Sequence, residues 1–82
     1  MTNINERIGY EMRSQRLLKR MTLAQMADRL GKSSRNTISL WELGRTQITV
    51  EDLKAYCDVL NVNYIDVLKK ASGEMYGWVI AT

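Results

Sequence analysis

The chain has 82 residues, of which 45% are apolar and 26% charged, and its formal net charge is +3. This length accommodates one small domain with a modest core, and the composition is that of a globular chain rather than a disordered one. A single cysteine, Cys57, and the absence of histidine exclude an intramolecular disulfide and a recognisable zinc site. We therefore expect a reducing, cytoplasmic setting, no metal and no cofactor.

The charge is unevenly distributed along the chain. Residues 1–45 hold nine Lys and Arg against four Asp and Glu, whereas residues 46–82 hold three against five. This asymmetry favours a basic face directed at a polyanion, most commonly nucleic acid, although scattered solvated charge fits the counts equally well. No apolar run approaches the roughly 20 residues of a membrane span, and no signal peptide is visible, so we expect no membrane association.

Apolar residues recur at helical spacing from the N-terminus onward. The first predicted helix covers residues 4–20, with an inward face that ends in Leu17 and Leu18. Thr22 and Gln25 form a capping-box pattern that begins a second helix, and Gly31 stands where its C-terminal cap belongs.

Three further helices are predicted after Gly31. Ser33 or Ser34 begins the third, which runs through Ile38, Trp41 and Leu43 to a stop at Gly44. The fourth starts at Thr49, has Val50 and Cys57 among its inward residues, and ends at Asn61, and the fifth starts at Asn63. Five short helices with brief connections indicate a compact all-α domain over residues 1–73.

Residues 74–82 break this pattern and form a predicted C-terminal extension. Tyr76, Trp78 and Ile80 alternate with small or apolar residues, which is the periodicity of a strand. An isolated strand cannot satisfy its own backbone groups. The extension is therefore expected either to pair with a second copy as a short dimerisation strand or to lie against the helices.

The second and third helices, joined by a few residues that include Gly31, have the layout of a helix-turn-helix. In that motif the first turn of the second helix meets base edges in the major groove. Here that turn carries Ser34, Arg35 and Asn36, followed one turn later by Leu40. Arg suits guanine, Asn suits adenine and an apolar side chain suits the thymine methyl group. For Leu40, partial burial in the core is an equally good interpretation.

These residues resemble the lambda-repressor-like, Cro-type (XRE) helix-turn-helix family of phage and bacterial regulators. The resemblance covers about residues 6–71 and is carried by "IGYEMRSQR", "MTLAQMADRLG", "NTISLWELGR" and "ITVEDLKAYCDVLNVNYIDVL". It implies a compact five-helix fold, double-stranded operator DNA as the ligand and a homodimer. It also implies an ion pair between Arg16 and Glu42, and a motif core that contains Ala27 and Trp41.

The resemblance also implies contacts from the rim of the motif to DNA phosphates. The candidates are Thr22, Leu23, Lys32, Ser39, Arg45, Thr46 and Gln47. Leu23 stands where the family commonly has Gln, so its contribution would come from the helix N-terminus. The chain has one residue more than usual between Gly31 and "TIS", which leaves open which of Ser34, Arg35 and Asn36 leads the helix.

The sequence shows no recognisable set of catalytic residues. There is no histidine, and no evident nucleophile–base pair, Gly-rich phosphate loop or pair of carboxylates on a cleft. We therefore predict a sequence-specific DNA-binding transcriptional regulator, a small phage-type or bacterial repressor that binds a pseudo-palindromic operator as a homodimer. The alternative is an antitoxin or protein-binding adaptor with a protein partner, since one fold serves several functions.

Overall fold

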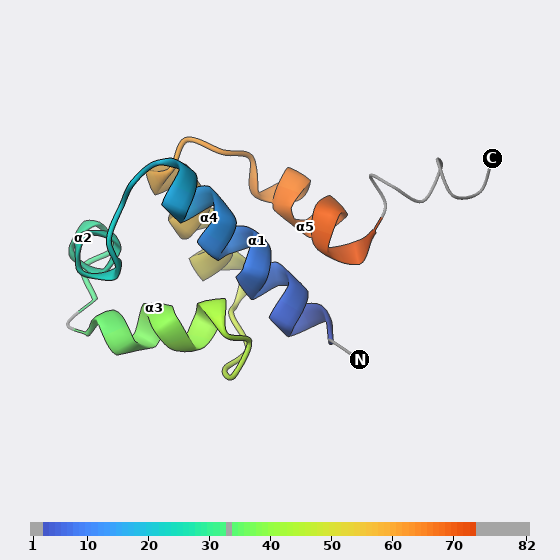
Figure 1. The fold of residues 1–82 in the computed structure, drawn as a ribbon, viewed down its shortest axis with the longest axis horizontal. Coiled ribbons are helices and arrows are strands. Elements are labelled where there is room, and N and C mark those ends of the chain that lie inside the picture. The colour runs from blue at the N-terminus through green and yellow to red at the C-terminus, as the bar shows by residue number, and fades with distance from the viewer. Residues whose placement is uncertain (1–2, 33, 74–82) are drawn as a thin grey trace.

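The structure is a computed structural model that describes residues 3–32 and 34–73, and within these ranges it contains five helices and no strand (Figure 1). They are α1 (Ile4–Leu18), α2 (Leu23–Arg29), α3 (Arg35–Glu42), α4 (Val50–Val59) and α5 (Tyr64–Ser72). α1 packs against both α3 and α5, and α2 packs against α3. The predicted all-α, five-helix fold is confirmed. The predicted extension, with Tyr76, Trp78 and Ile80, lies outside the described residues.

Every helix begins at a polar cap whose side-chain oxygen accepts a backbone N–H of the first turn. The caps are Asn3, Thr22, Ser34, Thr49 and Asn63. These bonds satisfy amides that have no partner within the helix. Since Ser34 is the cap of α3, Arg35 is the first helical residue of α3, which settles the position that the sequence left open.

The first helix ends earlier than its periodicity predicts. Arg20 has a left-handed backbone with φ of +55°, and the N–H groups of Arg20 and Met21 donate to the carbonyls of Leu17 and Arg16. This is the Schellman arrangement that terminates a helix. α1 therefore stops at Leu18 rather than at residue 20.

The core is one apolar cluster to which all five helices contribute. It contains Ile8, Met12, Met26, Ala27, Ile38, Trp41, Leu53, Tyr56, Cys57, Leu60, Val67 and Ala71. The predicted inward positions Leu17, Leu18, Leu43 and Val50 are wrong, because these residues are 51%, 74%, 54% and 63% exposed. In α1 the buried row continues from Met12 to position 16, one turn further, and that position is an arginine.

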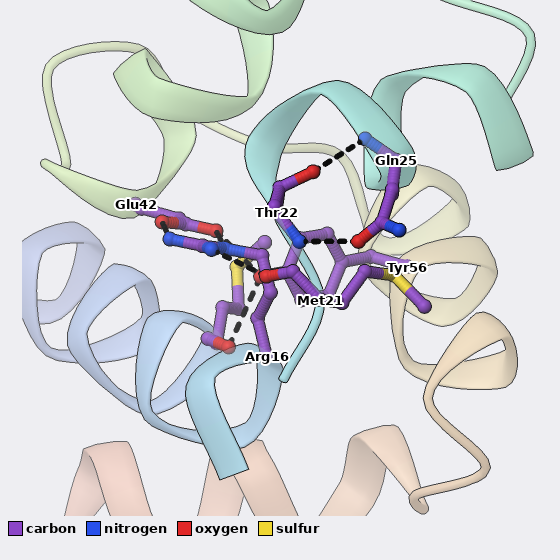
Figure 2. Close-up of polar contacts among 7 residues, drawn as sticks. Arg16, Met21, Thr22, Gln25, Glu42 and Tyr56 are labelled. Atoms are coloured by element: carbon purple, nitrogen blue, oxygen red, sulfur yellow. Dashed lines mark hydrogen bonds and ion pairs between the residues drawn. The ribbon is translucent and has the colours of Figure 1, made fainter. Parts of the chain in front are cut away.

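Arg16 forms a buried ionic cluster with Glu42 and Tyr56 (Figure 2). Its Nε and Nη2 atoms donate to Glu42 Oε2 and Oε1 at 2.7 and 2.9 Å, and both residues are only 6% exposed. Nη1 donates to the carbonyl of Met21 at 2.7 Å. The guanidinium thus connects α1, the end of α3 and the residue before the cap of α2.

Tyr56 completes the coordination of the carboxylate from α4. Its hydroxyl lies 2.6 Å from Glu42 Oε2 and 3.0 Å from the carbonyl of Met12, and the single phenol proton favours the closer, charged acceptor. Burial, followed by the hydrogen bond to Glu42, raises the pKa of Tyr56. The hydrogen bond to Glu42 is also the largest cause of the raised pKa of Arg16. The cluster therefore holds a guanidinium, a carboxylate and a neutral phenol.

A glycine allows α1 to approach α3 closely enough for this pairing. A Cβ atom built on Gly9 would lie 2.4 Å from the carbonyl oxygen of Glu42 and 2.5 Å from that of Trp41. Both distances are far below van der Waals contact, and both neighbours are backbone atoms that cannot rotate away. The backbone of α1 therefore touches the last turn of α3 directly at Gly9.

We expect Glu42→Ala to lower the free energy of unfolding by about 3 to 5 kcal/mol, because it leaves a buried guanidinium without its counter-charge. Tyr56→Phe removes one hydrogen bond to that carboxylate and should cost less, about 2 kcal/mol. Urea denaturation followed by circular dichroism measures both. Asp58→Ala, which breaks the exposed pair with Lys54, is the control and should change little. A Glu42→Ala variant as stable as the parent would contradict this account.

Gly9→Ala should destabilise the domain even though Ala favours a helix over Gly by about 1 kcal/mol. The added methyl group has to separate α1 from α3 and would stretch the bonds between Arg16 and Glu42. Ser14→Ala, in the same helix and away from this contact, is the matched control. Thermal melting of the two variants decides the matter: a higher melting temperature for Gly9→Ala would disprove the close contact.

Candidate nucleic-acid interface

α2 and α3 form the predicted helix-turn-helix, and they lie together at one end of the molecule (Figure 1). The turn between them contains Gly31, whose φ of +69° is left-handed, and a Cβ there would meet no atom within 4 Å. Gly31 is thus required by its backbone conformation and not by space. The N–H groups of Gly31 and Lys32 donate to the carbonyls of Asp28 and Ala27, which ends α2 before the chain enters α3.

The two faces of α3 have different surroundings. Ile38, Trp41 and Glu42 are buried against the other helices, and this leaves the opposite face open. Asn36 is exposed and Leu40, one turn further on, is half-buried. Helical spacing places these two side chains next to each other. The partial burial of Leu40 is compatible with either of its interpretations, so its role stays a prediction.

The first turn of α3 is open to solvent. Ser34 and Arg35 are exposed, and the Oγ atom of Ser34 accepts the N–H of Asn36 at 3.1 Å. A hydroxyl that accepts this bond keeps its own proton for another acceptor. Ser34, Arg35 and Asn36 therefore present a hydroxyl, a guanidinium and an amide at one helix terminus.

Apart from Lys32, the predicted phosphate contacts lie at the start of α2, on α3 and after the end of α3. Thr22 is exposed at the start of α2, where its capping box with Gln25 is formed at 3.1 and 2.8 Å. Leu23 is partly buried against the core, so its side chain belongs to the packing and only its backbone remains for a ligand. Ser39 is half-buried on α3, and the exposed residues after α3 are Arg45, Thr46 and Gln47.

Lys32 has intramolecular partners that sequence reasoning did not foresee. Its Nζ atom lies 4.0 Å from Asp52 Oδ1 and 5.7 Å from the centre of the Trp41 ring. The side chains of Lys32 and Asp52 are both more than one third exposed, and such a pair contributes little free energy. These contacts orient Lys32 without preventing it from binding an anion.

Sequence reasoning assigned no specific site to Arg20, which the structure places beside the motif. Arg20 and Arg35 line one surface hollow of about 490 Å³, to which the end of α1 and the start of α2 also contribute. The only sequence feature that could have pointed to Arg20 is its place as a basic residue just before Met21 and Thr22, between the first two helices. The left-handed backbone of Arg20 and its closeness to Arg35 follow from the tertiary structure.

Other kinds of site have less support. Among residues 3–32 and 34–73, no three Asp, Glu, Cys or His side chains are grouped so that they could hold a metal ion. No helix in the same ranges is long and apolar enough to cross a membrane. The basic and polar end formed by α2 and α3 is therefore the candidate site.

Comparisons with known proteins agree with this architecture. The helix-turn-helix family HTH_3 matches residues 12–67. A crystal structure of the clp gene regulator ClgR from Corynebacterium glutamicum is similar with a TM-score of 0.82 and 32% identity, over 92% of this chain and 96% of that one. A second ClgR structure has a TM-score of 0.82 and 30% identity, over 98% and 84% of the two chains.

No curated protein sequence matches the chain. The family match nevertheless spans more than half of the residues and includes α2, α3 and the complete ionic cluster. The chain belongs to the Cro/C1-type helix-turn-helix family of DNA-binding transcriptional regulators.

Proposed function

We propose that this protein is a sequence-specific repressor that places α3 in the major groove of an operator. The observation that carries the proposal is the first turn of α3, where Arg35 and Asn36 are exposed while Ile38 and Trp41 on the other side of the helix are buried. A helix held in this way offers its N-terminal side chains to base edges at a fixed angle.

Each exposed group has a suitable partner on DNA. Arg35 can donate two parallel hydrogen bonds to O6 and N7 of guanine, and Asn36 can bond to N6 and N7 of adenine. The hydroxyl of Ser34 can donate to either purine N7. Leu40, half-buried one turn beyond Asn36, has apolar surface left for a thymine methyl group.

Phosphate contacts from the rim fix the register of α3 without reading sequence. Thr22 and the amides at the start of α2 lie on one side, and Lys32, Ser39, Arg45, Thr46 and Gln47 surround the rest of the motif. The charge distribution supports these assignments, since residues 1–45 carry five more basic than acidic side chains. Affinity should therefore fall steeply as salt concentration rises.

The repressor acts as a homodimer on a pseudo-palindromic site in this proposal, with Tyr76, Trp78 and Ile80 of the extension in the interface. Repression follows when the dimer occupies promoter DNA in the cytoplasm, as small phage-type and bacterial repressors do. The likeness to ClgR, a clp gene regulator, supports a role in controlling genes. A two-fold dimer matches two half-sites about one helical turn of DNA apart.

Catalysis is not part of the proposal. Cys57, the only thiol, is 1% exposed, and burial raises its pKa to about 11. It is thus protonated and inaccessible at neutral pH, the opposite of a nucleophilic cysteine. An antitoxin or adaptor role remains the competing function, but it gives no reason for Arg35 and Asn36 to share an exposed helix terminus.

The first test is selection from a random duplex library with the purified protein at near-physiological salt. We expect enrichment of two related half-sites whose centres lie about one helical turn apart, because the two recognition helices of a dimer face the same side of DNA. Enrichment of single half-sites would remove the dimer from the proposal. A library that stays flat would reject sequence-specific binding and favour the adaptor function.

Arg35→Ala should weaken binding to the selected operator by about 1 to 3 kcal/mol and relax the preference at one base pair, because a bidentate contact with guanine is lost. Fluorescence anisotropy on the operator and on its single-base variants measures both effects. Lys69→Ala, which removes an exposed positive charge from α5, outside the helix-turn-helix, is the control. An equal loss on every sequence would mean that Arg35 contacts phosphate and not a base.

A further inference from the structure

Four helices of the described chain end in the same backbone motif. In each case the second residue after the helix is left-handed, and its N–H and the next one donate to carbonyls of the last helical turn. The four positions are Arg20, Gly31, Gly44 and Asn61. Gly has no Cβ to clash in this conformation, and Asn tolerates it better than most residues. Arg20 is the exception.

No contact within the described ranges compensates Arg20 for this unfavourable backbone. The residue is exposed, and its side chain forms no hydrogen bond or ion pair among residues 3–32 and 34–73. A residue kept in a strained conformation without a structural partner is a candidate for a functional role. Folding alone would favour Gly at this position, as at positions 31 and 44.

The surroundings of Arg20 suit an anion. The hollow of about 490 Å³ that it shares with Arg35 is also lined by Thr22, which is exposed and keeps a hydroxyl proton to donate. Among the described residues, no carboxylate lines this hollow, and Asp28 lines two neighbouring hollows, one together with Arg20 and the other together with Arg35. Asp28 is therefore near both arginines, but it forms no ion pair with either of them among the described residues, so both guanidinium groups stay available to an anion.

The position of Arg20 relative to the recognition helix is fixed from inside the molecule. The carbonyl of Met21, the next residue, accepts a 2.7 Å hydrogen bond from Arg16 Nη1, and Arg16 is paired with Glu42 at the end of α3. The turn between α1 and α2 and the helix α3 are thus attached to the same guanidinium. An anion bound at Arg20 would be held at a defined distance from the first turn of α3.

We propose that Arg20 binds a backbone phosphate of the operator in this hollow and so anchors the α1–α2 turn to DNA. The inference rests on the proposed function and adds a contact from outside the helix-turn-helix. The hydroxyl of Thr22 donates a hydrogen bond to the same phosphate, and Arg35 borders the phosphate from α3. Arg35 has five N–H donors, so bordering the phosphate leaves donors for a base. Phosphate binding gives a reason for a charged residue at this left-handed position.

Arg20→Gly is the decisive variant because it separates folding from binding. The melting temperature should rise by a few degrees, since Gly relieves the left-handed strain. Affinity should fall about tenfold for the selected operator and for random duplex DNA alike, because a charge-assisted contact with phosphate is lost. The slope of log affinity against log salt concentration should become shallower by about one.

Three matched variants identify the cause of these changes. Asn61→Gly removes a side chain from the same left-handed position at the end of α4 and should leave the affinity and the salt slope unchanged. Arg20→Lys keeps the charge and should retain most of the slope. Arg20→Ala removes the charge but keeps a Cβ atom, so it should lose affinity as Arg20→Gly does without a gain in melting temperature.

Two results would overturn the inference while the proposed function stands. In the first, the wild-type protein selects an operator and Arg20→Gly binds it with unchanged affinity and salt slope. In the second, Arg20→Gly loses affinity only for particular base sequences, which would make Arg20 a base-reading residue. A wild-type protein that selects no operator would instead reject the proposed function, and this inference with it.

Discussion

The buried ionic cluster of Arg16, Glu42 and Tyr56 is the interaction on which both the core and the exposed surface of the helix-turn-helix depend. Its three side chains come from α1, α3 and α4, and Arg16 also reaches the carbonyl of Met21. Each buried charge therefore has its partners only when these helices are packed together. Any arrangement that separates them leaves a charge in the core without a partner, at a cost of several kcal/mol. Small proteins typically have a stability of about 5 to 15 kcal/mol, so for this chain of 82 residues the penalty is a large fraction of the total.

The same cluster fixes the orientation of α3, and so determines how α3 would meet DNA in the proposed function. Glu42 holds the C-terminal end of the helix inside the molecule, and Gly9 lets α1 touch that last turn directly. The N-terminal end, with Arg35 and Asn36, is left at the surface. If α3 is the recognition helix, as proposed, it loses little conformational freedom on binding, because its orientation is already fixed.

In the proposed function, charge and backbone strain near the motif favour DNA binding at the expense of stability. Arg20 occupies a left-handed position that suits Gly, and Arg20 and Arg35 share a hollow without a counter-ion among its lining residues. Lys32 is the contrasting case, since Asp52 and the ring of Trp41 lie beside it. A loss of stability is expected where a surface has to attract phosphate, because the positive groups that bind the ligand repel one another in the free protein.

Sequence alone determined the fold class, the number of helices and the location of the helix-turn-helix. These properties depend on local rules: apolar spacing, side-chain caps such as Thr22 and Thr49, and Gly at positions 31 and 44. The resemblance of the motifs to a known family supplied the pairing of Arg16 with Glu42. Only the tertiary structure decided that α1 ends at Leu18, that Leu43 is exposed, and that Tyr56 completes the ionic cluster. It alone placed Arg20 beside Arg35, because contacts between residues far apart in the chain are set by how helices cross and not by the pattern within any one helix.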